Sequence, residues 1–158
     1  MTVKTPVYLD HHATTPLDRR VLAVLERVQR EHHGNPASAW HAEGWAAAKL
    51  VDQARTHVAS LIGAEPSEIL FTSGATEGAN LALLGACGPP PRGGGHLVAT
   101  VLEHEAVTGP LEELARRGWR LTTVPCRADG RVDPGDIEAA LENDTFLVAA
   151  MAAQNEIG

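Results

Sequence analysis

The sequence predicts an α/β fold, with a mainly parallel sheet that carries helices on both faces. From residue 69 onward, short apolar stretches alternate with stretches of helical periodicity, an order typical of βαβ units. No repeat or long low-complexity segment interrupts this order, and the Pro/Gly run at 88–95 is expected to be a surface connection. Of the 158 residues, 44% are hydrophobic and 21% charged, so the chain has enough apolar surface for a core.

Two helices are expected ahead of the alternating part. Thr15 is a good N-cap with Pro16 at the first helical position, and Gly63 is expected to stop a second helix over residues 41–62. The pattern then predicts, in order, a strand at 69–72, a helix at 77–85, a strand at 97–102, a helix at 106–117, a strand at 120–125, a helix at 134–141 and a strand at 145–151.

The last predicted strand is the most apolar, with the sequence FLVAAMAA at 146–153. Parallel strands of this kind are normally buried on both faces. No crossover helix or return strand follows it, so the pattern indicates the first part of a larger sheet that other protein covers.

Composition excludes several function classes. The chain carries 20 acidic and 13 basic residues, a net charge of −7, so we expect no nucleic-acid partner. No apolar run approaches the ~20 residues of a membrane span, and the first six residues lack the apolar core of a secretory signal. Two cysteines cannot form a disulfide framework, and neither adjacent histidine pair makes a preformed chelate for a metal. These features predict a soluble cytoplasmic protein without a metal site.

Polar residues follow three predicted strands, and the carboxyl ends of parallel strands are where open α/β sheets bind ligands. The first group is the turn at 72–77 (TSGATE), where a helix N-terminus favours an anion. The others are His104 and Asn155. Each has an ordinary structural explanation as well: an N-capped turn, a solvated strand end and a turn-forming asparagine.

Five segments resemble, in order and spacing, the NifS/IscS-like cysteine desulfurases, which are class V aminotransferase-fold enzymes that depend on pyridoxal phosphate. The segments are residues 8–16 (YLDHHATTP), 34–41 (GNPASAWH), 71–77 (FTSGATE), 103–104 (EH) and 155–158 (NEIG). The resemblance implies the large domain of an aspartate aminotransferase-like fold. Residues 1–15 would be an N-terminal arm at the substrate entrance, and residues 16–158 the first part of the cofactor-binding domain.

The resemblance also implies roles for individual residues. Ala75 and Thr76 match the positions that hold the phosphate of the cofactor. His104 matches the histidine that stacks on the pyridine ring and helps proton transfer, which makes it the expected catalytic residue. Asn155 matches the residue beside the cofactor's 3′-oxygen and near the substrate carboxylate.

Substrate-binding positions are implied nearer the N-terminus, where Ala13, Thr14, Asn35 and His41 match segments that line the substrate entrance. The implied reaction removes sulfur from L-cysteine to give L-alanine and an enzyme-bound persulfide, which serves sulfur transfer and iron–sulfur cluster assembly.

Two groups that this chemistry needs have no match in the sequence. The family's Schiff-base lysine lies in a Ser-x-His-Lys motif, whereas Lys4 and Lys49 are the only lysines here. Cys87 and Cys126 fall outside the family's nucleophile position. The sequence therefore suggests the N-terminal part of a desulfurase that needs a second polypeptide carrying the lysine and the cysteine.

On this hypothesis the isolated chain is inactive, and the complete enzyme is a dimer that meets a sulfur-acceptor or scaffold protein. Two alternatives stay open at this point. The chain could be half of another class V pyridoxal-phosphate enzyme. It could instead be a catalytically inactive scaffold or regulatory subunit that binds sulfur-transfer partners.

Overall fold

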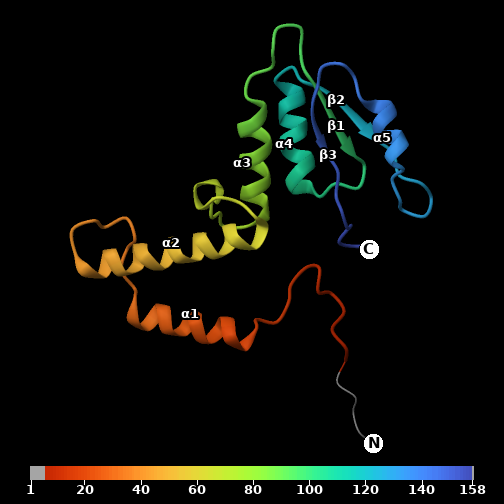
Figure 1. Ribbon diagram of the computed structural model, residues 1–158. Coiled ribbons are helices and arrows are strands. Elements are labelled where there is room, and N and C mark those ends of the chain that lie inside the picture. Colours follow the sequence, from red (N-terminus) through yellow and green to blue (C-terminus); the bar gives the residue numbers. More distant parts are fainter. Residues whose placement is uncertain (1–5, 158) are drawn as a thin grey trace, which may run out of the picture. The chain divides into compact units, whose positions relative to one another are not determined.

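The computed structural model describes residues 6–157, so Lys4 and Gly158 lie outside the described residues. The chain divides into two compact units, the first ending at Phe71 and the second beginning at Thr72. Figure 1 shows helices alone in the first unit, and helices together with the sheet in the second.

The first unit contains the helices α1 (Arg19–Glu31) and α2 (Ala42–Ile62) and the short 3-10 helix η1 (Pro66–Glu68). The predicted start of the first helix at Thr15 and Pro16 is wrong, because Asp18 is the N-cap. The Asp18 carboxylate accepts hydrogen bonds from the backbone and side chain of Arg20, at 2.8 and 3.0 Å to Oδ1. An aspartate with these two bonds is a better cap than the upstream threonine.

The second helix ends as the sequence predicts. Gly63 adopts a left-handed conformation with φ 69°, and its N–H donates to the carbonyl of Ala59. This conformation costs a glycine little and other residues more, so a single residue type sets the boundary.

The strand predicted at 69–72 is wrong, since these residues join no sheet. Leu70 and Phe71 are 65% and 48% exposed. The Arg55 side chain donates to the carbonyl of Ile69 and lies over the Phe71 ring, 5.1 Å from its centroid. A segment of β-forming residues needs a neighbouring strand for its backbone hydrogen bonds, and among the described residues none pairs with it.

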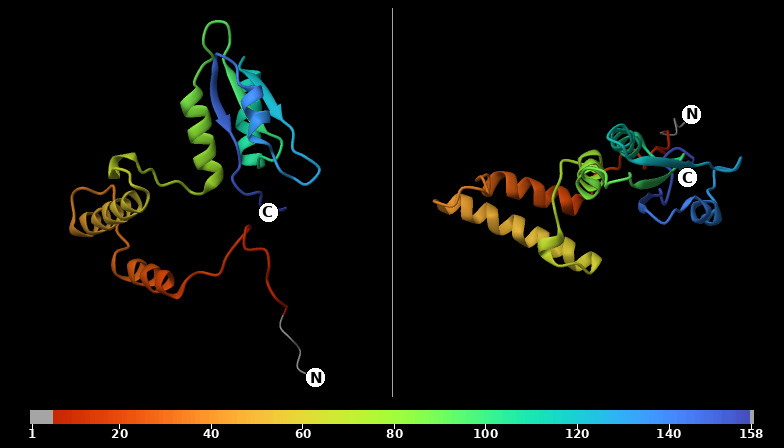
Figure 2. Two further views of the ribbon diagram at one scale, coloured as in Figure 1. Left: turned by 45° about the vertical axis from the view of Figure 1, so that its right-hand side comes forward. Right: turned by 90° about the horizontal axis from the view of Figure 1, so that it is seen from above.

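The second unit confirms the α/β class. Its elements are, in order, α3 (Ala75–Cys87), β1 (His96–Thr100), α4 (Glu105–Arg116), β2 (Arg120–Val124), α5 (Pro134–Ala140) and β3 (Thr145–Ala149). The strands form a parallel sheet in the order β2-β1-β3. Seen from above in Figure 2, α4 and α5 lie on opposite sides of the strands.

The core of this unit forms between the central strand and two helices. All five residues of β1 are buried. Leu97 and Ala99 of β1 pack with Leu83 of α3 and with Leu111 and Leu114 of α4. Alternate strand residues face the same side, so these contacts show that α3 and α4 cover the face of β1 that carries Leu97 and Ala99.

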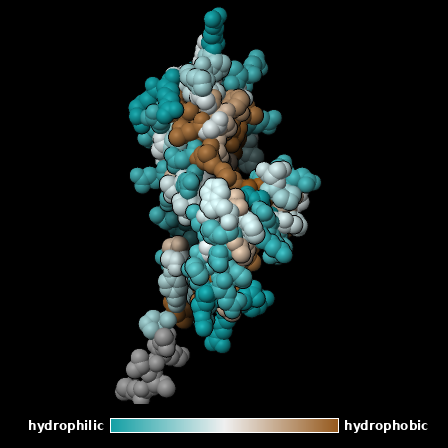
Figure 3. Space-filling model, turned by 90° about the vertical axis from the view of Figure 1, so that its left-hand side faces the viewer, coloured by the Kyte–Doolittle hydropathy of each residue, from teal (hydrophilic) through white to brown (hydrophobic). Residues whose placement is uncertain are grey.

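The last strand is buried only in part, so one of its faces is uncovered in this chain, and its covering by other protein stays a prediction. Leu147 and Ala149 pack against the core, whereas Phe146 and Val148 are 57% and 43% exposed. Apolar side chains reach the surface elsewhere too, such as Leu81 of α3, and Figure 3 shows brown apolar side chains among hydrophilic ones.

The amino end of the sheet is fixed by a buried histidine. The two ring nitrogens of His96 lie 2.8 Å from the hydroxyls of Thr145 and Thr122, on the two flanking strands.

Among residues 6–157, no helix combines the length and apolar character that crossing a membrane requires.

Candidate functional site

Helix α3 begins with unpaired backbone donors. Its N-cap Gly74 makes no side-chain cap hydrogen bond. Within residues 6–157, no acceptor is found for the N–H groups of Ala75 and Thr76. Such a helix end, with its positive dipole, binds anions. The Thr76 side chain adds a hydroxyl beside these donors.

The turn before α3 is held by Glu77. Its carboxylate accepts a hydrogen bond from the Ser73 N–H at 2.6 Å. Hydrogen bonds from the Ser73 hydroxyl and backbone lower the pKa of Glu77. The first turn of the helix is therefore fixed by its own residues, with the N–H groups of Ala75 and Thr76 left for a ligand.

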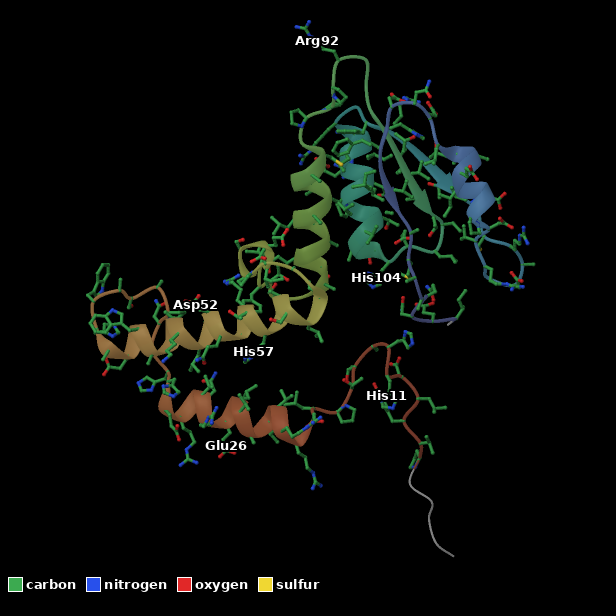
Figure 4. The ribbon with its side chains drawn as sticks, in the orientation of Figure 1. His11, Glu26, Asp52, His57, Arg92 and His104 are labelled. Atoms are coloured by element: carbon green, nitrogen blue, oxygen red, sulfur yellow. The ribbon has the colours of Figure 1, made fainter. Side chains whose placement is uncertain are left out.

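His104 begins α4. Its Nδ1 accepts a hydrogen bond from the Ala106 N–H at 3.0 Å, so the side chain caps the helix. When the ring is neutral, its proton therefore resides on Nε2. Figure 4 places His104 at the end of the second unit toward which β1 and β3 run. The exposed ring leaves a face and Nε2 free for a ligand.

The structure brings Thr76 and His104 to one open cavity of ≈ 450 Å³. Helix α3 contributes Thr76, Asn80 and Leu84, and α4 contributes residues from Glu105 onward. The Asn80 amide donates to the carbonyl of Thr76 at 2.8 Å. A planar aromatic side chain thus shares a pocket with the first turn of α3, whose donors are of the kind that suits an anion.

The cavity wall also carries Glu113. Its hydrogen bond from Arg117 and the nearby charge of Arg116 lower the pKa of this carboxyl. The two arginines offset much of the negative charge that Glu113 brings to the wall.

Asn155 lies in an exposed turn after β3 and is not among the residues that line this cavity. The turn is organised by Gln154, whose Oε1 accepts from the N–H groups of Glu156 and Ile157 at 2.5 and 2.9 Å. Ile157 also lies against Gly130, which has φ 80°. A Cβ at that glycine would be 2.6 Å from the Ile157 Cδ1, so glycine allows this close approach.

Glu103 has a structural role that the sequence did not indicate. One oxygen of its carboxylate accepts hydrogen bonds from the Thr100 hydroxyl at 2.7 Å and from the Met151 N–H at 2.6 Å. In the sequence, Glu103 stood out only as the acidic residue directly before His104, in the segment 103–104 that resembles the desulfurases. Nothing there indicated a partner 48 positions away.

The remaining predicted residues lie in the first unit. The N–H groups of Ala13 and Thr14 each lie 3.3 Å from the carbonyl of Asp10, in one turn. The Asn35 side chain accepts from the Ala37 N–H at 2.9 Å. His41 caps α2, with its Nδ1 accepting from the Gly44 N–H at 3.1 Å. Asn35 and His41 therefore each have a local structural role, and their role in substrate binding stays a prediction.

Comparison with known proteins decides the family. The family model described as aminotransferase class-V matches residues 7–158. The chain belongs to the class V aminotransferase family. The resemblance seen in the sequence motifs is thereby confirmed.

Curated relatives of this class V chain are cysteine desulfurases. It is 48% identical to cysteine desulfurase IscS of Neisseria meningitidis serogroup C over 158 residues. It is 47% identical to the IscS of Anaeromyxobacter sp. strain Fw109-5 over 156 residues. The matches cover 100% and 99% of this chain and 39% of each relative, so the chain spans well under half of their length.

Solved structures agree with the class V assignment. A NifS-like protein superposes with a TM-score of 0.89 at 39% identity, over 98% of this chain and 42% of that one. DndA from Streptomyces lividans gives 0.79 at 40% identity, over 95% and 42%. SspA, solved in complex with cysteine, gives 0.84 at 35% identity, over 94% and 43%.

Proposed function

We propose that this chain is the N-terminal part of a pyridoxal-phosphate-dependent cysteine desulfurase. The reaction takes sulfur from L-cysteine and yields L-alanine and an enzyme-bound persulfide, for sulfur transfer and iron–sulfur cluster assembly in the cytoplasm. The observation that carries the proposal is the cavity that Thr76 shares with His104 at the unpaired start of α3, in a chain 48% identical to a cysteine desulfurase.

The residues at the start of α3 fit the phosphate of the cofactor. The N–H groups of Ala75 and Thr76 and the Thr76 hydroxyl are donors, which suit an anion with several acceptor oxygens. A Cβ built on Gly74 would meet no atom within 4 Å, so the space in front of this helix end is open. Pyridoxal phosphate, when bound, supplies an electron sink for the bonds of the amino acid's α-carbon.

His104 suits the ring of the cofactor. The hydrogen bond from Ala106 to Nδ1 holds the imidazole by one nitrogen. The ring face can then stack on a planar ligand, and Nε2 can hold or deliver a proton near the substrate. Both tasks are assigned to His104, which makes it the proposed catalytic residue.

Roles in cofactor and substrate binding are also proposed for Asn155 and for four residues of the first unit. The Asn155 amide, for which no partner is recorded among the described residues, would donate to the 3′-oxygen of the cofactor and lie near the substrate carboxylate. Ala13, Thr14, Asn35 and His41 would line the substrate entrance. In this arrangement residues 1–15 form an N-terminal arm, and residues 16–158 are the first part of the cofactor-binding domain.

The covalent chemistry would come from a second polypeptide segment with a lysine and a cysteine. Cys87 is buried, and burial raises its pKa, so this thiol is a poor nucleophile. Lys49 is the only lysine among the described residues and lies on α2 in the first unit. We call the chain together with that second segment the complete assembly. We propose that it is a dimer and hands its sulfur to an acceptor or scaffold protein.

Borohydride reduction tests which of the two segments carries the lysine that bonds to the cofactor. The complete assembly and the isolated chain are each mixed with pyridoxal phosphate, reduced and mapped by mass spectrometry. We expect a pyridoxyl group on the lysine of the second segment and none, in stoichiometric amount, on Lys4 or Lys49. A stoichiometric adduct on either of these lysines would contradict the proposal.

Substrate class is tested with the complete assembly before any reduction, because borohydride blocks the cofactor. The complete assembly is expected to release alanine from L-cysteine in the presence of a thiol that accepts the sulfur. Release of another product from a different amino acid would indicate another class V enzyme. A complete assembly without turnover that still binds a sulfur-transfer protein would indicate a scaffold.

A further inference from the structure

Glu103 joins two segments of the second unit that are distant in the sequence. Its Oε1 accepts from the hydroxyl of Thr100, the last residue of β1, and from the N–H of Met151, two residues after the end of β3. Thr100 is 4% exposed and Glu103 is itself partly buried. A carboxylate oxygen with two short donors in such a place forms stronger hydrogen bonds than a neutral acceptor.

The segments tied by Glu103 carry two proposed site residues. His104 follows Glu103 directly, and Asn155 lies four residues after Met151. No ladder hydrogen bond extends from β1 to residue 151, because their pairing ends at Ala99 and Ala149. The Glu103 carboxylate is therefore a direct link between the two chain segments beyond the ends of the strands.

We infer that Glu103 is a positioning residue, whose carboxylate fixes the turn with Asn155 relative to His104. This inference rests on the proposed function, because the roles of Asn155 and His104 toward cofactor and substrate belong to it. Glu103 contacts neither ligand on this account. It acts through the Met151 N–H, and a displaced turn would lower catalysis, since misplacement of a positioning group by about 1 Å can cost about 10²-fold.

Three substitutions separate this role from general stability. Glu103→Ala removes both hydrogen bonds. Glu103→Asp keeps the charge but shortens the side chain by one methylene, so it serves where the alanine variant fails to fold. Glu103→Gln keeps an oxygen that can accept both bonds. Glu112→Ala is the matched control, because the Glu112 side chain is exposed on α4 and makes no hydrogen bond within the described part of the chain.

Amide hydrogen exchange of the complete assembly measures the link itself. We expect exchange of the Met151 N–H to rise about tenfold or more in Glu103→Ala and Glu103→Asp, and to stay near the unsubstituted rate in Glu103→Gln and Glu112→Ala. Unchanged exchange at Met151 in both the alanine and the aspartate variant would overturn the inference.

Steady-state kinetics with L-cysteine and the absorption band of bound pyridoxal phosphate measure the consequence. In the variants that free Met151, kcat/KM is expected to fall about 10-fold to 100-fold with the cofactor still bound, and Glu103→Gln is expected to restore it. Faster exchange of the Met151 N–H with unchanged kcat/KM in these variants would overturn the positioning role. An unsubstituted assembly that binds the cofactor but does not act on L-cysteine would overturn the proposed function instead, and the exchange experiment would then decide the link alone.

Discussion

The two units of the chain differ in how they use their apolar residues. In the second unit β1 is buried along its whole length, and α4 buries Pro110, Leu111 and Leu114 against the core. In the first unit α1 buries no residue, and the apolar residues of its amphipathic face are about half exposed: Val21, Leu22, Val24 and Leu25. Helix α2 buries only the small residues Gly44, Ala47 and Ala59.

This difference indicates that the second unit holds its own core, whereas the first does not. An amphipathic helix is stabilised mainly by burying its apolar face, and exposed apolar faces mark sites of contact with other protein. The candidate cavity lies in the unit with the packed core.

Each unit also contains a histidine that caps a helix, and substitution of the two is the sharpest test of the comparison. His104 caps α4 and His41 caps α2 in the same way, through Nδ1. Asparagine is a good N-cap, so His→Asn keeps the local structure at both positions. We expect His104→Asn to lower kcat by about 10²–10⁴-fold in the complete assembly, because it removes a general acid–base group.

The matched change His41→Asn is expected to have a much smaller effect, since His41 is proposed only to line the entrance. Steady-state kinetics with L-cysteine measure both variants, with cofactor content as the control. A loss below threefold for His104→Asn, with the cofactor retained, would mean that His104 takes no part in the reaction.

Leucine truncations test the difference in packing. Leu111 is 0% exposed and Leu22 is 51% exposed. Leu111→Ala should lower the free energy of unfolding by about 2–5 kcal/mol, because it leaves a cavity in the core. In the isolated chain, Leu22→Ala should change it by less than about 0.5 kcal/mol. Denaturant titration followed by circular dichroism measures both, and equal losses would contradict the contrast between the units.

Thr76→Val tests the phosphate site without disturbing either core. It deletes one hydrogen bond to the charged phosphate, worth roughly 1.5–3 kcal/mol, so cofactor affinity should fall about tenfold to a hundredfold. Titration of the complete assembly with pyridoxal phosphate measures this affinity. Thr14→Val, in the first unit, is the control, and equal weakening by both substitutions would argue against a phosphate site at α3.

The smallest expected effect is the pH response of the two helix starts. The Arg20 side chain lowers the pKa of Asp18 at α1, and the Ser73 hydroxyl lowers that of Glu77 at α3. A carboxylate with a lowered pKa stabilises the folded state above its unfolded pKa, and this stabilisation is lost as the pH falls through the folded value. Asp18→Asn and Glu77→Gln should each slightly flatten the loss of helix content below about pH 4. Circular dichroism during acid titration measures the helix content. A loss of helix content at low pH that is the same in both variants as in the unsubstituted chain would contradict the stabilising role of these two carboxylates.

Local chemistry explains which parts of the fold could be predicted from sequence. Gly63 ended α2 as expected, because a left-handed residue at a helix end needs no partner elsewhere. The start of α1 was missed because Asp18 competes with Thr15 as a cap, and Arg20 decides between them. The strand expected at 69–72 failed for a different reason: extended residues become a strand only where another strand pairs with them.

In the candidate site, too, features with a local signal could be predicted, and features that depend on a distant partner could not. Thr76 and His104 could be singled out because each lies in a polar segment that follows an expected strand, although the first of these strands was wrong. Their shared cavity follows from the packing of α3 on α4. The link made by Glu103 could not be predicted, because its second donor is a backbone N–H 48 positions away and carries no signal in the sequence.

Turnover of L-cysteine by the chain with and without the second segment tests the central claim most directly. The account predicts no release of alanine or sulfide by the isolated chain, because it has no positioned lysine for the cofactor and no cysteine at the family's nucleophile position to accept the sulfur. It predicts turnover when the segment with the Ser-x-His-Lys lysine and the catalytic cysteine is joined to it or added. Sustained, cofactor-dependent release of alanine by the isolated chain would contradict the account.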